Sequence, residues 1–79
     1  MIIISARSVQ IRDYILNRLG RGCTILYGEG GYTGEHREVI YLAIHRKELP
    51  DVKAALKRID PEVFVVVNDA YEVLGDFRR

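Results

Sequence analysis

Residues 37–67 read REVIYLAIHRKELPDVKAALKRIDPEVFVVV, and this stretch decides the fold. Arg37–His45 has a strongly apolar middle and predicts a strand. A helix is expected from about Lys47, and its buried apolar stripe is expected to consist of Leu49, Val52, Leu56 and Ile59. It ends at Asp60 because a residue that precedes proline avoids the α conformation. Val63–Val67 is β-branched and aromatic, which predicts a second strand.

The sequence before this stretch repeats the same pattern. Met1–Ser5 predicts a strand, and Val9–Leu19 predicts a helix that Ser8 caps at its N-terminus. The apolar stripe of this helix is expected to consist of Ile11, Ile15 and Leu19, which repeat every four residues, with Leu16 beside them. Gly20 is expected in the left-handed conformation that ends many helices. Thr24–Tyr27 predicts the next strand.

The resulting order is βαββαβ, the ferredoxin-like plan of the α+β class. Right-handed crossovers then place both helices on one face of an antiparallel four-stranded sheet. We expect a single PII-like or ferredoxin-like domain over residues 1–79, with room for one further short strand in Tyr71–Arg79.

Composition excludes several classes of protein. Twelve basic residues against eleven acidic ones give a net charge of +1, which provides no general attraction for nucleic acid. No apolar run approaches the roughly 20 residues of a membrane span. A single cysteine, Cys23, cannot form a disulfide within the chain and suits a reducing compartment, so a cytoplasmic location is expected.

Apolar runs on both faces of the strands predict self-association. Two helices cover one face of a sheet, and the second face should alternate to polar residues if water covers it. Met1–Ile4, Val39–Ile44 and Val63–Val67 do not alternate in this way. We therefore expect a homo-oligomer, most simply a trimer, with coverage of that face by the C-terminal tail as the alternative.

Six of the seven glycines lie between Gly20 and Gly34. No nucleotide-binding fingerprint fits their spacing, and the second part of the block, Gly28–Gly34, joins two strands rather than a strand and a helix. Two interpretations stay open for this part. It is a glycine-rich hairpin loop, or it is a binding loop that presents Tyr32 and Thr33.

Other polar residues give weaker signals. Arg21 either lies in solvent beside a helix cap or acts as an anion-binding fork. His36 and His45 have no metal-ligand spacing, and no set of residues suggests a nucleophile or an acid–base pair, so no enzyme, catalytic residue, metal or cofactor is expected. Cys23 is expected to act as a small hydrophobic residue.

A family resemblance covers nearly the whole chain. It is carried, in order, by these motifs: Ile2-Ile3-Ile4-Ser5, Leu19-Gly20-Arg21-Gly22-Cys23-Thr24, Gly30-Gly31-Tyr32-Thr33-Gly34, Arg46-Lys47-Glu48-Leu49, Ile59-Asp60-Pro61, Phe64-Val65-Val66-Val67 and Glu72-Val73-Leu74-Gly75. The chain thus resembles the C-terminal domain, of unknown function, of YitT-type bacterial membrane proteins.

The resemblance implies a domain on the cytosolic face of the membrane, following a multi-pass region that is absent from this sequence. The chain is then either an excised domain or a standalone version. It also looks like the PII-like group of ferredoxin-fold sensors, which are commonly trimers that bind nucleotides or other small ligands between subunits. This second likeness is an analogy of fold.

Two functions follow as hypotheses. The first is a sensing or regulatory domain that binds an anionic metabolite or nucleotide at a subunit boundary. Its expected ligand-binding residues are Arg21, Gly30, Gly31, Tyr32, Thr33, Gly34 and Arg46. The alternative is a structural oligomerisation module that binds no ligand.

Overall fold

The computed structural model describes residues 1–69, 74 and 75 of the chain. Its strands are β1 (Ile2–Ile4), β2 (Thr24–Glu29), β3 (His36–Tyr41) and β4 (Phe64–Val66), and its main helices are α1 (Ser8–Asp13) and α2 (Leu49–Ile59). The order βαββαβ is confirmed. The strand expected within the C-terminal tail lies outside the described residues.

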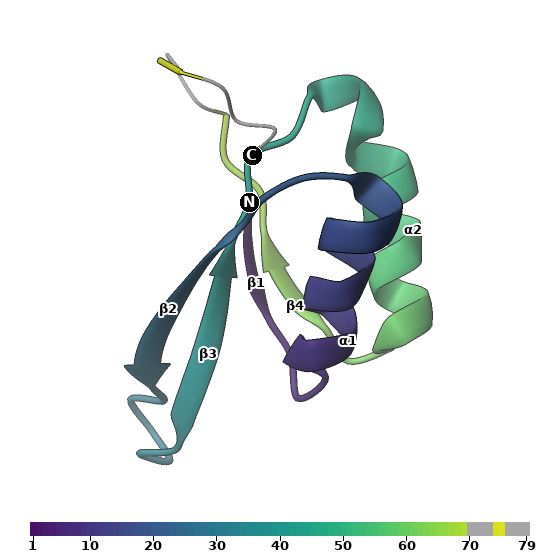
Figure 1. Cartoon of the computed structure of the whole chain (residues 1–79). Helices are drawn as coiled ribbons and strands as arrows, with labels where there is room; N and C mark the ends of the chain where they lie inside the picture. Colours follow the sequence, from purple (N-terminus) through teal and green to yellow (C-terminus); the bar gives the residue numbers. More distant parts are fainter. Residues whose placement is uncertain (70–73, 76–79) are drawn as a thin grey trace.

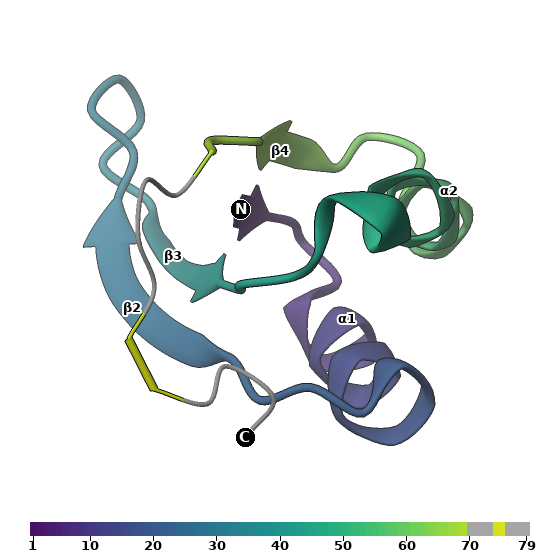
Figure 2. The same cartoon turned by 90° about the horizontal axis from the view of Figure 1, so that it is seen from above.

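The four strands form one antiparallel sheet in the order β2-β3-β1-β4. β1 is central, and its Ile3 is opposite Ile40 of β3 on one side and Val65 of β4 on the other. Figures 1 and 2 show both helices against the same face of this sheet. The ferredoxin-like α+β fold is therefore confirmed.

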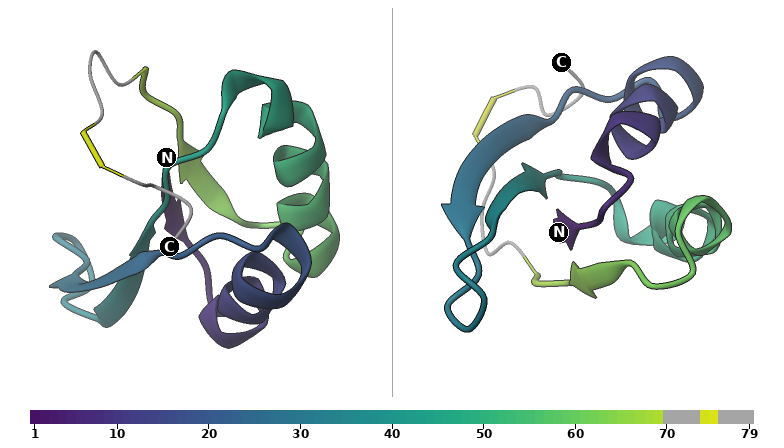
Figure 3. Two further views of the ribbon diagram at one scale, coloured as in Figure 1. Left: turned by 45° about the horizontal axis from the view of Figure 1, so that its top comes forward. Right: turned by 90° about the horizontal axis from the view of Figure 1, so that it is seen from below.

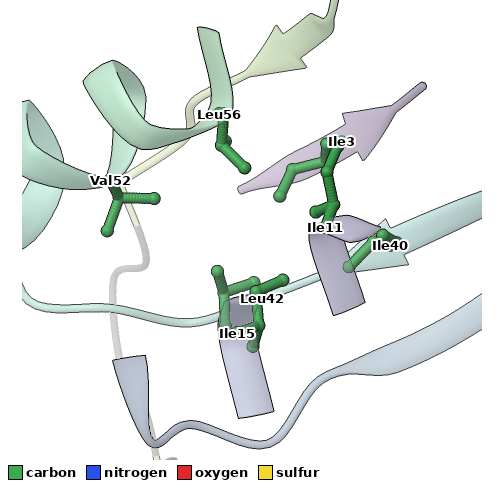
Figure 4. Packing of buried hydrophobic residues seen from close by; sticks show 7 residues of the cluster. All are labelled: Ile3, Ile11, Ile15, Ile40, Leu42, Val52 and Leu56. Atoms are coloured by element: carbon green, nitrogen blue, oxygen red, sulfur yellow. The ribbon is translucent and has the colours of Figure 1, made fainter. Parts of the chain in front are cut away.

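The core lies between the helices and the sheet. Among the described residues it consists of seven fully buried side chains, shown in Figure 4: Ile3, Ile11, Ile15, Ile40, Leu42, Val52 and Leu56. α2 contributes Val52 and Leu56 from its apolar stripe, as predicted. Leu16, expected beside the stripe of the first helix, is instead 56% exposed.

The first helix differs from its prediction at both ends. Ser8 is its first residue rather than its N-cap, because the Ser8 hydroxyl donates a 2.6 Å hydrogen bond to Glu38 of β3 and makes no capping bond. After Asp13 the helix widens into a π-helical segment, η1 (Tyr14–Leu19). Gly20 closes it with φ of +71°, and the Gly20 N–H donates to the carbonyl of Ile15. The left-handed Gly20 was predicted and is confirmed.

Strand lengths follow from the available partners. β3 ends at Tyr41 rather than His45, because Tyr41 is opposite Ile2 and Thr24, the first residues of both neighbouring strands. One further bond, from the Leu42 N–H to the Met1 carbonyl, closes the pairing at 2.9 Å. β2 is longer than predicted and runs through Gly28 to Glu29, which shortens the glycine loop.

The β2–β3 hairpin extends beyond the layer of helices (Figures 1 and 3). Its pairing begins at Thr24 opposite Tyr41 and ends at Glu29 opposite His36. We call the outer part of this hairpin, residues 27–38, the arm. Because each strand of the hairpin has six residues, the two ends of its paired region lie about 20 Å apart.

Candidate functional site

The face of the sheet opposite the helices is apolar, as the sequence predicted. Side chains alternate along a strand, so the neighbours of the buried Ile3 and Ile40 point away from the core. These neighbours and their partners across the strands form what we call the apolar sheet face: Ile2, Ile4, Leu26, Val39, Tyr41, Phe64 and Val66.

The most exposed members of this face are Leu26 (50%), Tyr41 (51%) and Phe64 (59%). The strand register places Leu26, Val39, Ile4 and Phe64 in one row across all four strands. Such a set exposes on the order of 500 Å² of apolar surface, the upper end of what soluble monomers show and the size of many interaction sites. The C-terminal tail was the alternative cover expected for this face, and its residues 70–73 and 76–79 lie outside the described part of the chain.

The tip of the arm is a closed loop. The Gly30 N–H donates to the Glu35 carbonyl and the Gly34 N–H donates to the Gly30 carbonyl, both at 2.8 Å. Gly34 has φ of +74°, a conformation that favours glycine. Gly30 and Gly34 are among the expected ligand-binding residues, and their backbone N–H groups thus serve the loop itself. Tyr32 is fully exposed at the tip.

The sequence interpretation missed Arg37, which lies against this loop. A Cβ added at Gly30 would be 2.9 Å from the Thr33 hydroxyl and 3.4 Å from Nε of Arg37. A side chain at position 30 would therefore be crowded, because the loop and the Arg37 side chain occupy the space beside Gly30. Arg37 also forms a 3.7 Å ion pair with Glu35. A strand register predicted for this hairpin from the sequence would have placed Arg37 close to the glycine loop.

Arg21 lies at the other end of the hairpin and forms an ion pair. Its guanidinium is 2.7 Å from Oε2 of Glu48, and both side chains are mostly buried. The other carboxylate oxygen, Oε1, accepts the His45 N–H at 3.0 Å. This backbone hydrogen bond and the Arg21 pair hold the pKa of Glu48 below its usual range, against an opposing effect of burial. Glu48 thereby links the segment between η1 and β2 to the 3₁₀ turn η2 (Arg46–Glu48) before α2.

Arg21→Met is expected to lower the free energy of unfolding at pH 7 by about 1–3 kcal/mol, because Glu48 loses its cationic partner. The folded-state pKa of Glu48 is lowered, so its contribution is present above the ordinary pKa of 4.5 and is lost as the pH falls through the folded-state value. Urea unfolding of both proteins at pH 7 and pH 3 measures this. The difference in the free energy of unfolding between the wild-type chain and the variant should be smaller at pH 3 than at pH 7. An equal difference at the two pH values would contradict an ionic role for the pair. In a Glu48→Gln background, the Arg21→Met substitution should lower the free energy of unfolding at pH 7 by a smaller amount than in the wild-type chain.

Arg46 lies beside a cavity at the same end of the sheet as Arg21. Its guanidinium pairs with Asp69 at 3.0 Å, and both side chains are 81% exposed. The cavity has a volume of about 580 Å³. Apolar residues such as Ile44, Leu49 and Val67 line it, with Arg46 and Asp69 among its polar residues. We call this hollow the sheet-end cavity.

The structure therefore divides the expected ligand-binding residues into two groups. Gly30, Gly31, Tyr32, Thr33 and Gly34 form the tip of the arm, while Arg21 and Arg46 lie at the opposite end of the hairpin. Within one chain these groups do not converge on one ligand. A site that uses both would need a second copy of the chain.

Other chemistry is limited in the part of the chain that the structure describes. Cys23 packs against the core, and burial raises the pKa of its thiol while the nearby Arg12 opposes the shift. It behaves as the small hydrophobic residue that was expected. Residues 1–69, 74 and 75 contain no group of three potential ligands arranged to hold a metal ion. None of the helices among them is both long enough and apolar enough to cross a membrane.

The fold and its surface define a class: a small ferredoxin-like α+β domain whose second sheet face is apolar and is covered by none of the helices in residues 1–69, 74 and 75. Residues 21–75 match the family described as "Uncharacterized protein conserved in bacteria (DUF2179)". The chain belongs to this DUF2179 family. A crystal structure of a DUF2179 protein from Eubacterium ventriosum has the same fold, with a TM-score of 0.74, 34% sequence identity and coverage of 85% of this chain and 92% of that one.

Full-length relatives are named as membrane proteins. The UPF0750 membrane protein YpjC of Bacillus subtilis is 42% identical over 74 residues, which cover 94% of this chain and 26% of the relative. The UPF0750 membrane protein YitT of the same organism is 28% identical over 78 residues, 99% of this chain and 28% of the relative. The resemblance to YitT-type proteins is confirmed, and the chain spans about a quarter of their length.

Proposed function

We propose that this domain joins the subunits of YitT-type membrane proteins by self-association through the apolar sheet face. In this role it lies on the cytosolic side of the membrane and catalyses no reaction. One observation carries the proposal: a continuous apolar row crosses all four strands on the face that no helix covers. Burial of this face against other copies removes it from water.

The size of the face suits a contact between subunits. A standard interface removes about 800 Å² of surface from each partner, with an apolar centre and a polar rim. The apolar sheet face supplies the centre, with Tyr41 and Phe64 as aromatic anchors of the kind enriched in interfaces. Thr24, at the end of one row, and Arg37, beside Leu26 and Val39 on the same face, supply part of the rim.

Light scattering coupled to size exclusion tests the proposal on the 79-residue chain. A mass near 27 kDa is expected at micromolar concentration, three times the 9.1 kDa of one chain, since PII-like domains are commonly trimers. A mass of one chain at that concentration would overturn the proposal.

Ligand sensing is the second candidate function, with an anionic metabolite or nucleotide held at a subunit boundary. The placement of Arg46 beside a cavity, with the glycine tip at the opposite end of the hairpin, favours it, because association of two copies could bring the two groups together. A thermal-shift screen with nucleotides and anionic metabolites tests it. A ligand at 100 times its Kd adds about 2.7 kcal/mol of stability, which such a screen detects. Absence of stabilisation at millimolar concentrations would contradict it.

A further inference from the structure

The arm exposes two large aromatic side chains. Tyr32 at the tip is fully exposed, and Tyr27, in the last part of β2, is 82% exposed. Tyrosine is enriched at the centres of protein interfaces, since its ring is apolar and its hydroxyl can still form a hydrogen bond. Figure 3 shows the arm reaching away from the rest of the chain, where a second molecule can approach it from several sides.

The sheet-end cavity is suited to an aromatic side chain. It is larger than a tyrosine ring at about 580 Å³, and its lining is mainly apolar. His45, Arg46 and Asp69 lie among its lining residues and offer polar partners to a hydroxyl group. Pockets that bind well commonly combine an apolar wall with a few polar groups in this way.

The two features lie at opposite ends of the hairpin and carry opposite charges. Glu29, Glu35 and Glu38 against Arg37 give the arm an excess of two negative charges. The other end carries Arg21, Arg46 and Lys47 against Glu48 and Asp69, an excess of one positive charge. Complementary charges of this kind orient two partners as they meet.

We propose that the arm of one copy docks into the sheet-end cavity of a second copy, with the Tyr32 side chain inserted among the apolar residues of the cavity. This inference rests on the proposed self-association and names the contact that fixes the arrangement of the subunits. The two surfaces lie on different parts of the chain, so the contact is heterologous and repeats from one copy to the next until a ring closes.

The glycines of the tip suit this role. Gly31 has open space around the position of a Cβ, so the tip is narrow beside Tyr32. The ring of Tyr32 can then enter a cavity without a steric clash between its neighbours in the tip and the edge of the cavity. Arg37 packs beside Gly30 and supports the base of the loop from within the arm.

Crosslinking between engineered cysteines tests the contact. In a Cys23→Ala background, Tyr32→Cys is combined with Asn68→Cys, which lies in the wall of the cavity. A bis-maleimide with a reach well below the roughly 20 Å length of β2 cannot join these positions within one chain. The matched control combines Tyr32→Cys with Lys53→Cys, an exposed position on α2. The 32/68 pair is expected to give about tenfold more covalent oligomer than the 32/53 pair.

Each outcome has a separate meaning. Equal crosslinking of the two pairs, in a protein that light scattering shows to be oligomeric, overturns arm docking and leaves self-association in place. Crosslinking of Tyr32→Cys alone to itself, at the level expected of the 32/68 pair, also overturns it, because the arms would then meet each other. A monomer in light scattering overturns self-association and arm docking together. Tyr32→Ala, which removes an exposed side chain, should raise the dissociation constant at least about tenfold while the monomer stays folded.

Discussion

Leu56→Ala is expected to lower the free energy of unfolding by about 2–5 kcal/mol. Leu56 is fully buried on α2 and belongs to the cluster of seven side chains between the helices and the sheet (Figure 4). Its truncation removes apolar contact and leaves a cavity that the neighbours only partly fill. Small domains have a total stability of about 5–15 kcal/mol, so a large part of it would be lost. Urea unfolding followed by circular dichroism measures the change.

Leu16→Ala is the matched control, because it removes the same atoms from a side chain that is 56% exposed. Its effect should stay within about 0.5 kcal/mol, as for most surface substitutions. Similar losses for the two variants would contradict the division between core and surface described above. They would place Leu16 in the core, where the sequence pattern alone had put it.

Phe64→Glu is expected to convert the oligomer into a monomer that remains folded. Phe64 is 59% exposed at the end of the apolar row, so a glutamate can point into water in the single chain. In the assembly the same carboxylate would be taken out of water without a cationic partner, which costs several kcal/mol for each copy. Light scattering gives the mass, and circular dichroism shows whether the fold is retained.

Val9→Glu introduces the same charge on α1, at a residue that is 63% exposed and lies away from the apolar sheet face. This control variant should keep the mass of the wild-type chain. If Phe64→Glu keeps it as well, the apolar sheet face is not the interface. If both variants are monomeric, an added negative charge dissociates the oligomer wherever it is placed, and the result does not identify the apolar sheet face as the interface.

Much of the fold could be predicted from the sequence because local and long-range preferences agree. The apolar run of Val39–Ile44 and the spaced stripe of α2 each point to one structure, and Gly20 ends its helix as the pattern of residues predicts. The apolar character of the second sheet face was also predicted from a lack of alternation, and Leu26 and Phe64 are exposed on that face.

Other features depend on contacts that local patterns do not contain. β3 ends where its partners end, and the Ser8 hydroxyl turns to Glu38, 30 residues away, instead of capping its helix. The π-helical segment η1 replaces a helix whose periodicity looked regular. Its widened turns close through bonds that span five residues.

The candidate site was the least predictable part. Arg21 pairs with Glu48, 27 residues away, and Arg46 pairs with Asp69, 23 residues away. The sequence identifies each basic residue, but it does not show which distant acidic residue lies next to it in the fold. The division of the expected ligand residues between the two ends of the hairpin likewise follows from strand pairing alone.

The central position of β1 has a consequence for how the chain reaches this structure. β2 and β3 are neighbours in sequence, and their hairpin can form early from local contacts. β1 instead pairs with residues 39–41 on one side and 64–66 on the other. Contacts of such long range slow folding, because a long loop must close before they form. During synthesis, the first of the four strands to leave the ribosome is therefore among the last to gain both of its neighbours.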